Sequence, residues 1–143
     1  MSEYRLPHQE FRRLHRRAYA AQQRGHFEVC GLLVVRRRAP SRLGLCFMKN
    51  MVTNAGQFLL DDRQVSVQRA IARRGGHRVV GMFHSHPVGY ARLGPRDRRA
   101  TPTNWLHLVH DVCGVEPKLW RIVRRRARRT VVEVPIAVER SPK

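Results

Sequence analysis

The sequence predicts a single α/β domain, and three observations lead to that prediction. The chain has 143 residues, enough for one hydrophobic core and too few for two independent ones. Short apolar runs typical of buried strands alternate with segments whose apolar residues recur every three or four positions, as in amphipathic helices. The sequence contains no internal repeat, linker or long low-complexity segment. We therefore expect one domain over residues 1–143, with its core within about 8–138.

The N-terminal part of the sequence predicts a helix followed by paired strands. Pro7 precedes apolar residues spaced three or four apart, which indicates an amphipathic helix that ends near Gly25. The run from Val29 to Val35 is nearly all apolar and is typical of a buried strand. After an arginine-rich turn, residues 43–48 form a second strand that can pair with the first.

The rest of the chain adds a helix and further strands. Asp61 and Gly75 provide an N-cap and a stop for a helix between them. Residues 78–83 predict a buried strand that runs directly into the segment His-Ser-His-Pro. Residues 88–103 lack periodicity, which predicts a loop with one short helix near Asp97. Strands are then expected at 105–109, 118–124 and 130–138, the last two joined by a basic turn.

The charge of the chain indicates which partners its surface attracts, and its hydropathy indicates in which compartment we expect it. The chain has 29 Lys and Arg residues against 10 Asp and Glu, a formal net charge of +19. Such a surface attracts nucleic acid, an acidic protein or an anionic membrane surface, although arginine also serves as a generic solvated residue. The sequence has neither a secretory signal nor an apolar stretch of the ~20 residues that span a bilayer. We therefore expect a cytoplasmic protein without membrane insertion.

The cysteines agree with a reducing compartment. Cys30, Cys46 and Cys113 are odd in number, lie far apart and fall in or beside apolar runs. We expect all three to be reduced core residues. The sequence has no Cys-x-x-Cys pair that would indicate a structural zinc site.

Four residues carry the chemistry that the sequence predicts. Residues two apart in an extended segment point to the same side, so the imidazoles of His84 and His86 can converge while Ser85 faces away. The following loop can return a carboxylate from Asp97. Two imidazoles and one carboxylate with an open fourth position are typical of a catalytic zinc, and Glu28 can supply a carboxylate base from an adjacent strand. His-x-His alone is a weak signal in a chain with eight histidines.

These residues resemble a known family motif. The segment GMFHSHP, followed after ten residues by Asp97 and preceded by Glu28 in EVCGLL, is similar to the JAMM (MPN+) motif of a glutamate, His-x-His-Pro and an aspartate. The likeness spans about 8–138. It implies a JAB/MPN (cytidine-deaminase-like) fold, an α/β fold with a curved, mostly antiparallel β-sheet flanked by helices. The short segments near the site resemble a compact prokaryotic type.

The resemblance also implies an activity. Family members hydrolyse peptide or isopeptide bonds at the C-terminus of a ubiquitin-like or sulfur-carrier protein, as deubiquitinase-like isopeptidases. Carried over residue by residue, His84, His86 and Asp97 would hold one Zn²⁺ per chain, and Glu28 would activate water. The implied partner is a β-grasp protein with a Gly-Gly-type C-terminus, with an E1-like enzyme in the same pathway.

One position departs from the family pattern. The family has a serine three residues before the aspartate, where this chain has Gly94. Loss of one oxyanion donor can cost on the order of 10²-fold in rate. Gly94, Ser85 and Thr101 are the candidate substrate or oxyanion positions, with Thr101 or a backbone N–H as the substitute donor.

Two other functions stay open at this stage. A catalytically weak or inactive JAB-domain scaffold that binds a ubiquitin-like protein is motivated by Gly94. A basic nucleic-acid-associated protein is motivated by the arginines, among them the cluster at 124–129. His107 and His110 are three apart in a strand, so we expect them to face opposite ways rather than form a second metal site.

Overall fold

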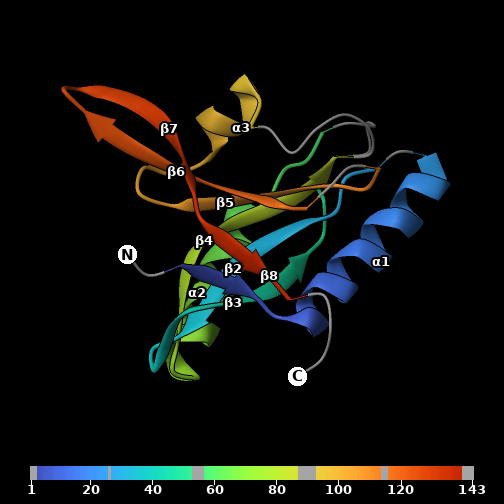
Figure 1. Ribbon diagram of the computed structural model, residues 1–143, viewed down its shortest axis with the longest axis horizontal. Helices are drawn as coiled ribbons and strands as arrows, with labels where there is room; N and C mark the ends of the chain where they lie inside the picture. The colour runs from blue at the N-terminus through green and yellow to red at the C-terminus, as the bar shows by residue number, and fades with distance from the viewer. Residues whose placement is uncertain (1–2, 26, 53–56, 87–92, 114–115, 140–143) are drawn as a thin grey trace.

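A mixed sheet with helices on both sides forms the structure (Figure 1). The computed structural model describes residues 3–25, 27–52, 57–86, 93–113 and 116–139. Pro87 and His26 lie outside the described residues. The described elements, in chain order, are β1 (Tyr4–Leu6), α1 (His8–Gly25), β2 (Cys30–Arg36), β3 (Ala39–Met48), α2 (Asp62–Arg74), β4 (His77–His86), α3 (Pro95–Ala100), β5 (Leu106–Asp111), β6 (Lys118–Arg125), β7 (Arg128–Val134) and β8 (Ile136–Val138).

The strands of the described residues form one eight-stranded sheet in the order β7-β6-β5-β4-β2-β3-β1-β8. The pairs β7/β6, β6/β5, β4/β2 and β2/β3 are antiparallel. The pairs β5/β4, β3/β1 and β1/β8 are parallel. The sheet curls strongly, so that β8 crosses in front of the central strands in Figure 1. The predicted α/β class with a curved, mostly antiparallel sheet is confirmed.

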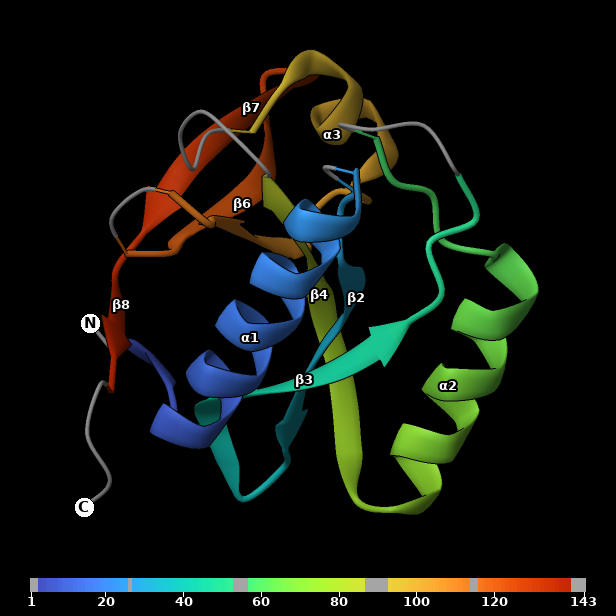
Figure 2. The ribbon, with the colours of Figure 1, turned by 90° about the vertical axis from the view of Figure 1, so that its right-hand side faces the viewer.

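Alternation along the central strands divides the core between the two faces of the sheet. On one face, Leu33 of β2 and Phe83 of β4 pack with Leu14 of α1. On the other face, Leu32 and Met82 belong to a second buried cluster, against which α2 packs. Figure 2 shows α1 lying across the sheet and α2 at its side. Because side chains alternate, the face that carries Met82 also carries the even-numbered residues that follow it in β4.

Both predicted long helices are present, with the expected end signals. Helix α1 begins directly after Pro7, and its Glu10 carboxylate accepts a hydrogen bond of 2.6 Å from the backbone N–H of Leu45, which ties the helix to β3. Helix α2 begins after Asp61, whose carboxylate caps the helix by accepting from the N–H of Arg63 at 3.0 Å. None of the helices in the described part of the chain is both long and apolar enough to cross a bilayer.

Two features of the sheet were not predicted. The three-residue strand β1 lies between β3 and β8, and its Leu6 is fully buried. The single strand expected over 130–138 is divided at Pro135 into β7 and β8. Proline cannot donate a ladder hydrogen bond, so the chain leaves one partner strand there and joins another. Strand β1 is too short to show a period and forms because β3 and β8 flank it.

The cysteines differ in their surroundings. Cys30 is buried and Cys46 is partly buried, as expected of core residues. Cys113 is exposed, so the expectation that all three belong to the core is wrong for this residue. It follows the end of β5, where the chain leaves the sheet, and its Sγ lies 3.4 Å from Nε2 of Gln22.

Strands β4 and β5 approach so closely at Gly81 that a Cβ there would collide with the carbonyl of Leu106. We therefore expect Gly81→Ala to lower the free energy of unfolding by about 3 kcal/mol, measured by denaturant titration. Gly44→Ala is the control, because its Cβ would meet a methyl group of Val34 at 3.2 Å, which can shift, and the Val34 carbonyl oxygen at 3.5 Å, an ordinary contact. The control should lose less than about 1 kcal/mol, and equal losses would contradict this account of the β4–β5 contact.

Candidate metal centre

The candidate ligands lie where the C-terminal end of β4 runs beside the start of β2. Strand β4 ends at His86, and β2 begins two residues after Glu28. The antiparallel register pairs Cys30 with His84, and the N–H of Ser85 donates to the carbonyl of Val29 at 2.9 Å. Extending this register by two residues sets Glu28 opposite His86. The pairing of β2 with β4 thus places the Glu28 carboxylate beside the imidazoles.

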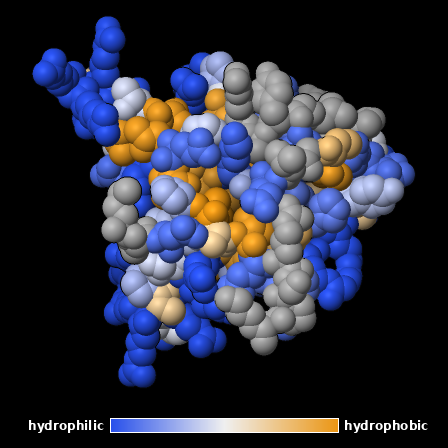
Figure 3. Space-filling model, in the orientation of Figure 1, coloured by the Kyte–Doolittle hydropathy of each residue, from blue (hydrophilic) through white to orange (hydrophobic). Residues whose placement is uncertain are grey.

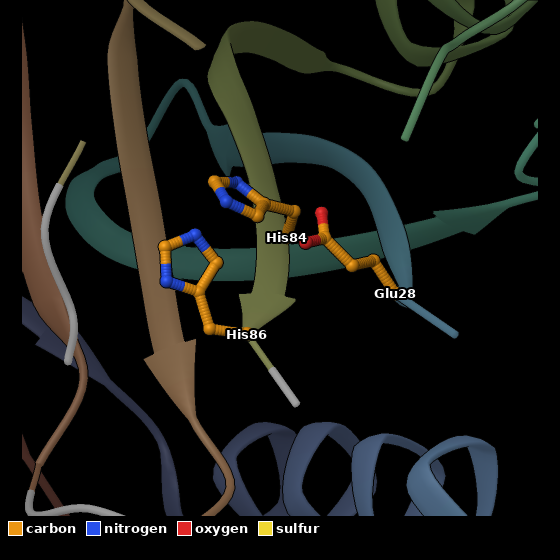
Figure 4. A group of neighbouring side chains, drawn as sticks. All are labelled: Glu28, His84 and His86. Atoms are coloured by element: carbon orange, nitrogen blue, oxygen red, sulfur yellow. The ribbon is translucent and has the colours of Figure 1, made fainter. Parts of the chain in front are cut away.

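The side chains of this cluster share one face of the sheet. Figure 4 shows His84 and His86 on the same side of β4, with Glu28 reaching across from the neighbouring chain segment. One ligand atom from each of the three lies within 4.8 Å of the others. This group corresponds to the two predicted histidine ligands and the predicted base.

Asp97 approaches the same point from α3. Its Oδ2 lies 3.4 Å from Nε2 of His84 and 3.8 Å from Nε2 of His86. Ligand atoms about 2.1 Å from a tetrahedral zinc are about 3.4 Å from one another. The Asp97 carboxylate therefore lies at about the spacing of zinc ligands from each of the two imidazoles.

A short helix turn holds Asp97 in place. Helix α3 begins at Pro95, as expected for a short helix near Asp97, with Gly94 as its N-cap. The backbone N–H of Gly94 donates to Oδ2 of Asp97 at 3.1 Å. The carboxylate is thereby directed toward His84.

The protein atoms fit a bound cation. Nε2 of His84 is buried and has no hydrogen-bond partner within the described residues. An unsatisfied buried polar atom costs about 1–3 kcal/mol, so such atoms are uncommon unless a ligand satisfies them. A metal ion at the point shared by His86 and Asp97 would satisfy this lone pair.

His84 is enclosed on its remaining sides. The ring of Phe58 stacks on its imidazole with centroids 4.5 Å apart and planes 17° apart. Nδ1 of His84 lies 2.7 Å from Nε2 of His107, whose own Nδ1 lies 2.6 Å from Oγ1 of Thr101. These contacts fix the imidazole in the plane that it occupies.

The sequence-based interpretation missed the part played by His107. The expectation that His107 and His110 face opposite ways is confirmed, because His110 contacts His15 on the other face, with ring nitrogens 3.0 Å apart. The available signal was a histidine inside the apolar run Trp-Leu-His-Leu-Val, since a buried imidazole requires a hydrogen-bond partner.

Two of the three candidate oxyanion positions are closed to a substrate. Ser85 is buried, and its Oγ accepts from the N–H of Val29 at 2.9 Å. Thr101 is fully buried, and its hydroxyl contacts the carbonyl of Asp97 at 2.6 Å. These placements correct the expectation that either hydroxyl faces a substrate. Gly94 lies beside the site, and its own N–H is bonded to Asp97.

Burial sets the protonation states of this site. It raises the pKa of Glu28 from 4.5 to about 7; the charges of His86 and Arg96 lower it and that of Asp97 raises it further. Burial and the neighbouring His107 hold the pKa of His84 well below 6.5. Burial also acts to raise the pKa of Asp97, but interactions with His86, His84 and the N–H of Gly94 outweigh it and lower the pKa. A neutral imidazole and an ionised carboxylate are what a cation requires.

The raised pKa of Glu28 predicts a pH-dependent stability. Between the unfolded value of 4.5 and the folded value of about 7, the folded protein binds more protons than the unfolded chain, so stability falls as the pH rises. Glu28→Gln removes this loss of stability, because glutamine does not titrate. In zinc-free protein, the unfolding free energy of the variant minus that of the wild type should grow by about 3 kcal/mol between pH 4.5 and 7.5. Contributions from titratable groups that do not interact with Glu28 cancel in this difference, and a difference that does not change with pH would contradict the assignment.

The comparisons with known proteins agree with this geometry. The family model for prokaryotic homologs of the JAB domain matches residues 11–125, most of the chain. The matched range contains Asp97 and the three residues of the cluster, Glu28, His84 and His86. No curated protein matches the chain.

Several solved structures share the fold. A protein of Desulfitobacterium hafniense has a TM-score of 0.75 at 24% identity, covering 98% of this chain and 95% of that one. A JAB1/MPN domain protein of Archaeoglobus fulgidus has a TM-score of 0.54 at 18% identity, covering 96% and 100%. A structure described as JAMM, a metalloprotease-like zinc site in the proteasome and signalosome, has a TM-score of 0.53 at 13% identity, covering 95% and 99%. The protein therefore belongs to the prokaryotic JAB-domain family and has the JAB/MPN fold.

Proposed function

We propose that the protein is a zinc-dependent isopeptidase or peptidase that cleaves the bond at the C-terminus of a ubiquitin-like or sulfur-carrier protein. The observation that carries this proposal is the buried, unsatisfied Nε2 of His84, which faces the Asp97 carboxylate with a second carboxylate, Glu28, close by. Three ligands and a neighbouring base are the components of a hydrolytic zinc site. The family match and the zinc site named for one structural relative support the same chemistry.

The ligands and the base have different roles. His84, His86 and Asp97 would hold the ion, because their spacing fits a tetrahedral site with a fourth position open. When bound, zinc would lower the pKa of a water molecule toward ~7 and polarise the scissile carbonyl. Glu28 lies two residues before β2 and would remain available for proton transfer.

Glu28 would carry one proton through the reaction. Its carboxylate accepts a proton from water as the water oxygen forms a bond to the scissile carbonyl carbon. It then donates that proton to the amine nitrogen as the carbon–nitrogen bond breaks, which leaves a carboxylic acid and an amine and restores the base. Asn50 supports the position of Glu28, since its Nδ2 donates to the Glu28 carbonyl at 3.0 Å.

A groove leads to Glu28 and would take the substrate's C-terminal tail. It has a volume of about 560 Å³ and lies between the end of α1 and β3. Its apolar lining includes Ala20, Ala21, Phe27, Val29, Phe47 and Met48. A groove of this size accommodates a short extended peptide.

The charge of the protein favours an acidic partner. Arg17 and Arg24 of α1 line the groove and are exposed. The guanidinium of Arg17 lies 4.1 Å from the centre of the Phe47 ring, which holds it over the groove. Figure 3 shows hydrophilic side chains over much of one face, with apolar side chains near its middle. With a net charge of +19, this surface would attract an acidic β-grasp protein, with an E1-like enzyme in the same pathway.

The second candidate is a scaffold of the same fold, and Gly94 is the observation that favours it. A glycine there offers no hydroxyl to a developing oxyanion, and its N–H is bonded to Asp97. A scaffold would bind a ubiquitin-like protein without cleaving it. The complete set of ligands and base favours the hydrolase.

Glu28→Gln tests the hydrolase directly. It removes the proton acceptor but keeps the size of the side chain, so we expect cleavage of C-terminally extended ubiquitin-like or sulfur-carrier proteins to slow by about 10²–10⁴-fold with zinc content unchanged. Mass spectrometry of the products measures the cleavage. Glu133→Gln, an exposed acid on β7, is the matched control and should retain full activity. A zinc-loaded wild type that binds such a partner without Glu28-dependent cleavage would favour the scaffold.

Gly94→Ser tests whether the missing hydroxyl limits the rate. A Cβ at this position would lie 3.5 Å from Oδ2 of Asp97, an ordinary contact, and the backbone φ is −71°, so serine fits without strain. We expect Gly94→Ser to accelerate cleavage by up to about 10²-fold. Gly94→Ala, which adds the Cβ without the hydroxyl, should not accelerate it. Equal rates for the serine variant and the wild type would show that the protein does not lack an oxyanion donor.

A further inference from the structure

A continuous chain of hydrogen bonds lies behind the metal centre. Nδ1 of His84 lies 2.7 Å from Nε2 of His107, and Nδ1 of His107 lies 2.6 Å from Oγ1 of Thr101. The Thr101 hydroxyl also lies 2.6 Å from the backbone carbonyl of Asp97. The chain therefore begins at one candidate ligand and ends at the backbone of another.

The chemistry of the groups fixes the direction of each hydrogen bond. The carbonyl of Asp97 can only accept, so the single proton of the Thr101 hydroxyl is donated to it. Oγ1 must then accept from His107, which places the proton of His107 on Nδ1. The other nitrogen of a neutral His107 is an acceptor, and the proton shared with His84 must belong to Nδ1 of His84.

We propose that Thr101 and His107 are positioning residues that hold His84 in the tautomer able to bind a metal. With Nδ1 of His84 protonated, Nε2 carries a lone pair, and this is the nitrogen that faces Asp97. The inference rests on the zinc site of the proposed function. It adds that the tautomer is already set before the ion arrives.

The surroundings of these hydrogen bonds exclude the opposite direction of proton donation, in which His107 would carry its proton on Nε2. His84, His107 and Thr101 are all fully buried, so water does not compete for these hydrogen bonds. With the proton of His107 on Nε2, its Nδ1 would take the single proton of the Thr101 hydroxyl, and the oxygens of Thr101 and Asp97 would then lie 2.6 Å apart with no proton between them. A charged His107 would be a fully buried imidazolium, which is costly.

The fold fixes the positions of His107 and Thr101 in this chain of hydrogen bonds. The parallel register pairs His107 of β5 with Met82 of β4, so His107 shares a face with His84. Thr101 directly follows α3, and its own carbonyl accepts a hydrogen bond from the guanidinium of Arg129 on β7. The hydrogen bonds from His84 through His107 and Thr101 to the Asp97 carbonyl, called the relay below, therefore link the histidine ligand on β4 to the carboxylate ligand on α3.

The first test is the nitrogen chemical shifts of the histidine rings in zinc-free, uniformly ¹⁵N-labelled protein. The proposal predicts that His84 and His107 both carry their proton on Nδ1. This readout requires no variant and no substrate. A proton on Nε2 of His84 would overturn the proposal.

The second test is zinc affinity, measured by competition with a chromogenic chelator. Thr101→Val keeps the shape of the side chain and removes the hydroxyl, so His107 loses its acceptor and zinc should bind about 10–100-fold more weakly. Thr101→Ser restores the hydroxyl and should bind within about threefold of the wild type. Thr130→Val is the control, because the Thr130 hydroxyl on β7 is buried without a hydrogen-bond partner among the described residues. It should leave zinc affinity unchanged.

The outcomes separate the relay from the metal site itself. Unchanged affinity in Thr101→Val, or equal weakening in Thr101→Val and Thr101→Ser, would overturn the relay alone. A wild type that binds no zinc would overturn the zinc site and the relay together. If Thr101→Val does not fold, the ¹⁵N shifts of the wild type decide the question.

Discussion

The site depends on one interaction, the antiparallel pairing of β2 with β4 in the register that sets Cys30 beside His84. Strand alternation sends His84 and His86 to one face, and the same register carries Glu28 to them. A shift by one residue would turn the imidazoles toward the α1 side of the sheet and separate them from the carboxylate. The close packing of β5 against β4 then brings in His107. The sheet thus sets the positions of His84, His86 and Glu28, and α3 supplies Asp97.

Burial determines the protonation states of the side chains in this site. The imidazole of His84 has no exposed surface, lies against Phe58 and is bonded to His107, so it remains neutral and oriented. The same burial makes Glu28 a weaker acid than an exposed glutamate. Asp97 stays ionised because its neighbours outweigh the effect of burial. One buried environment therefore gives the two carboxylates different roles, as a ligand and as a proton carrier.

Most of the fold and the core of the site could be predicted from the sequence, because both depend on local patterns. His84 and His86 follow an apolar run that can only be a buried strand, and Pro95 indicates the start of the helix that carries Asp97. The features that were missed depend on contacts between distant segments. Strand β1 exists through its neighbours β3 and β8, and the partner of His107 is set by the β4–β5 register. Strand β1 has no signal within its own segment, and the apolar run around His107 indicates a buried imidazole without indicating which residue is its partner.

The zinc content of the purified protein tests the central claim most directly, because every role assigned to these residues depends on a metal held by the sheet and α3. Elemental analysis should find about one zinc per chain in the wild type, the number that one open tetrahedral site holds. The double variant His84→Ala/His86→Ala, still folded by circular dichroism, should contain almost none. Stoichiometric zinc in that variant, or a wild type that takes up no zinc when the metal is supplied, would contradict the account.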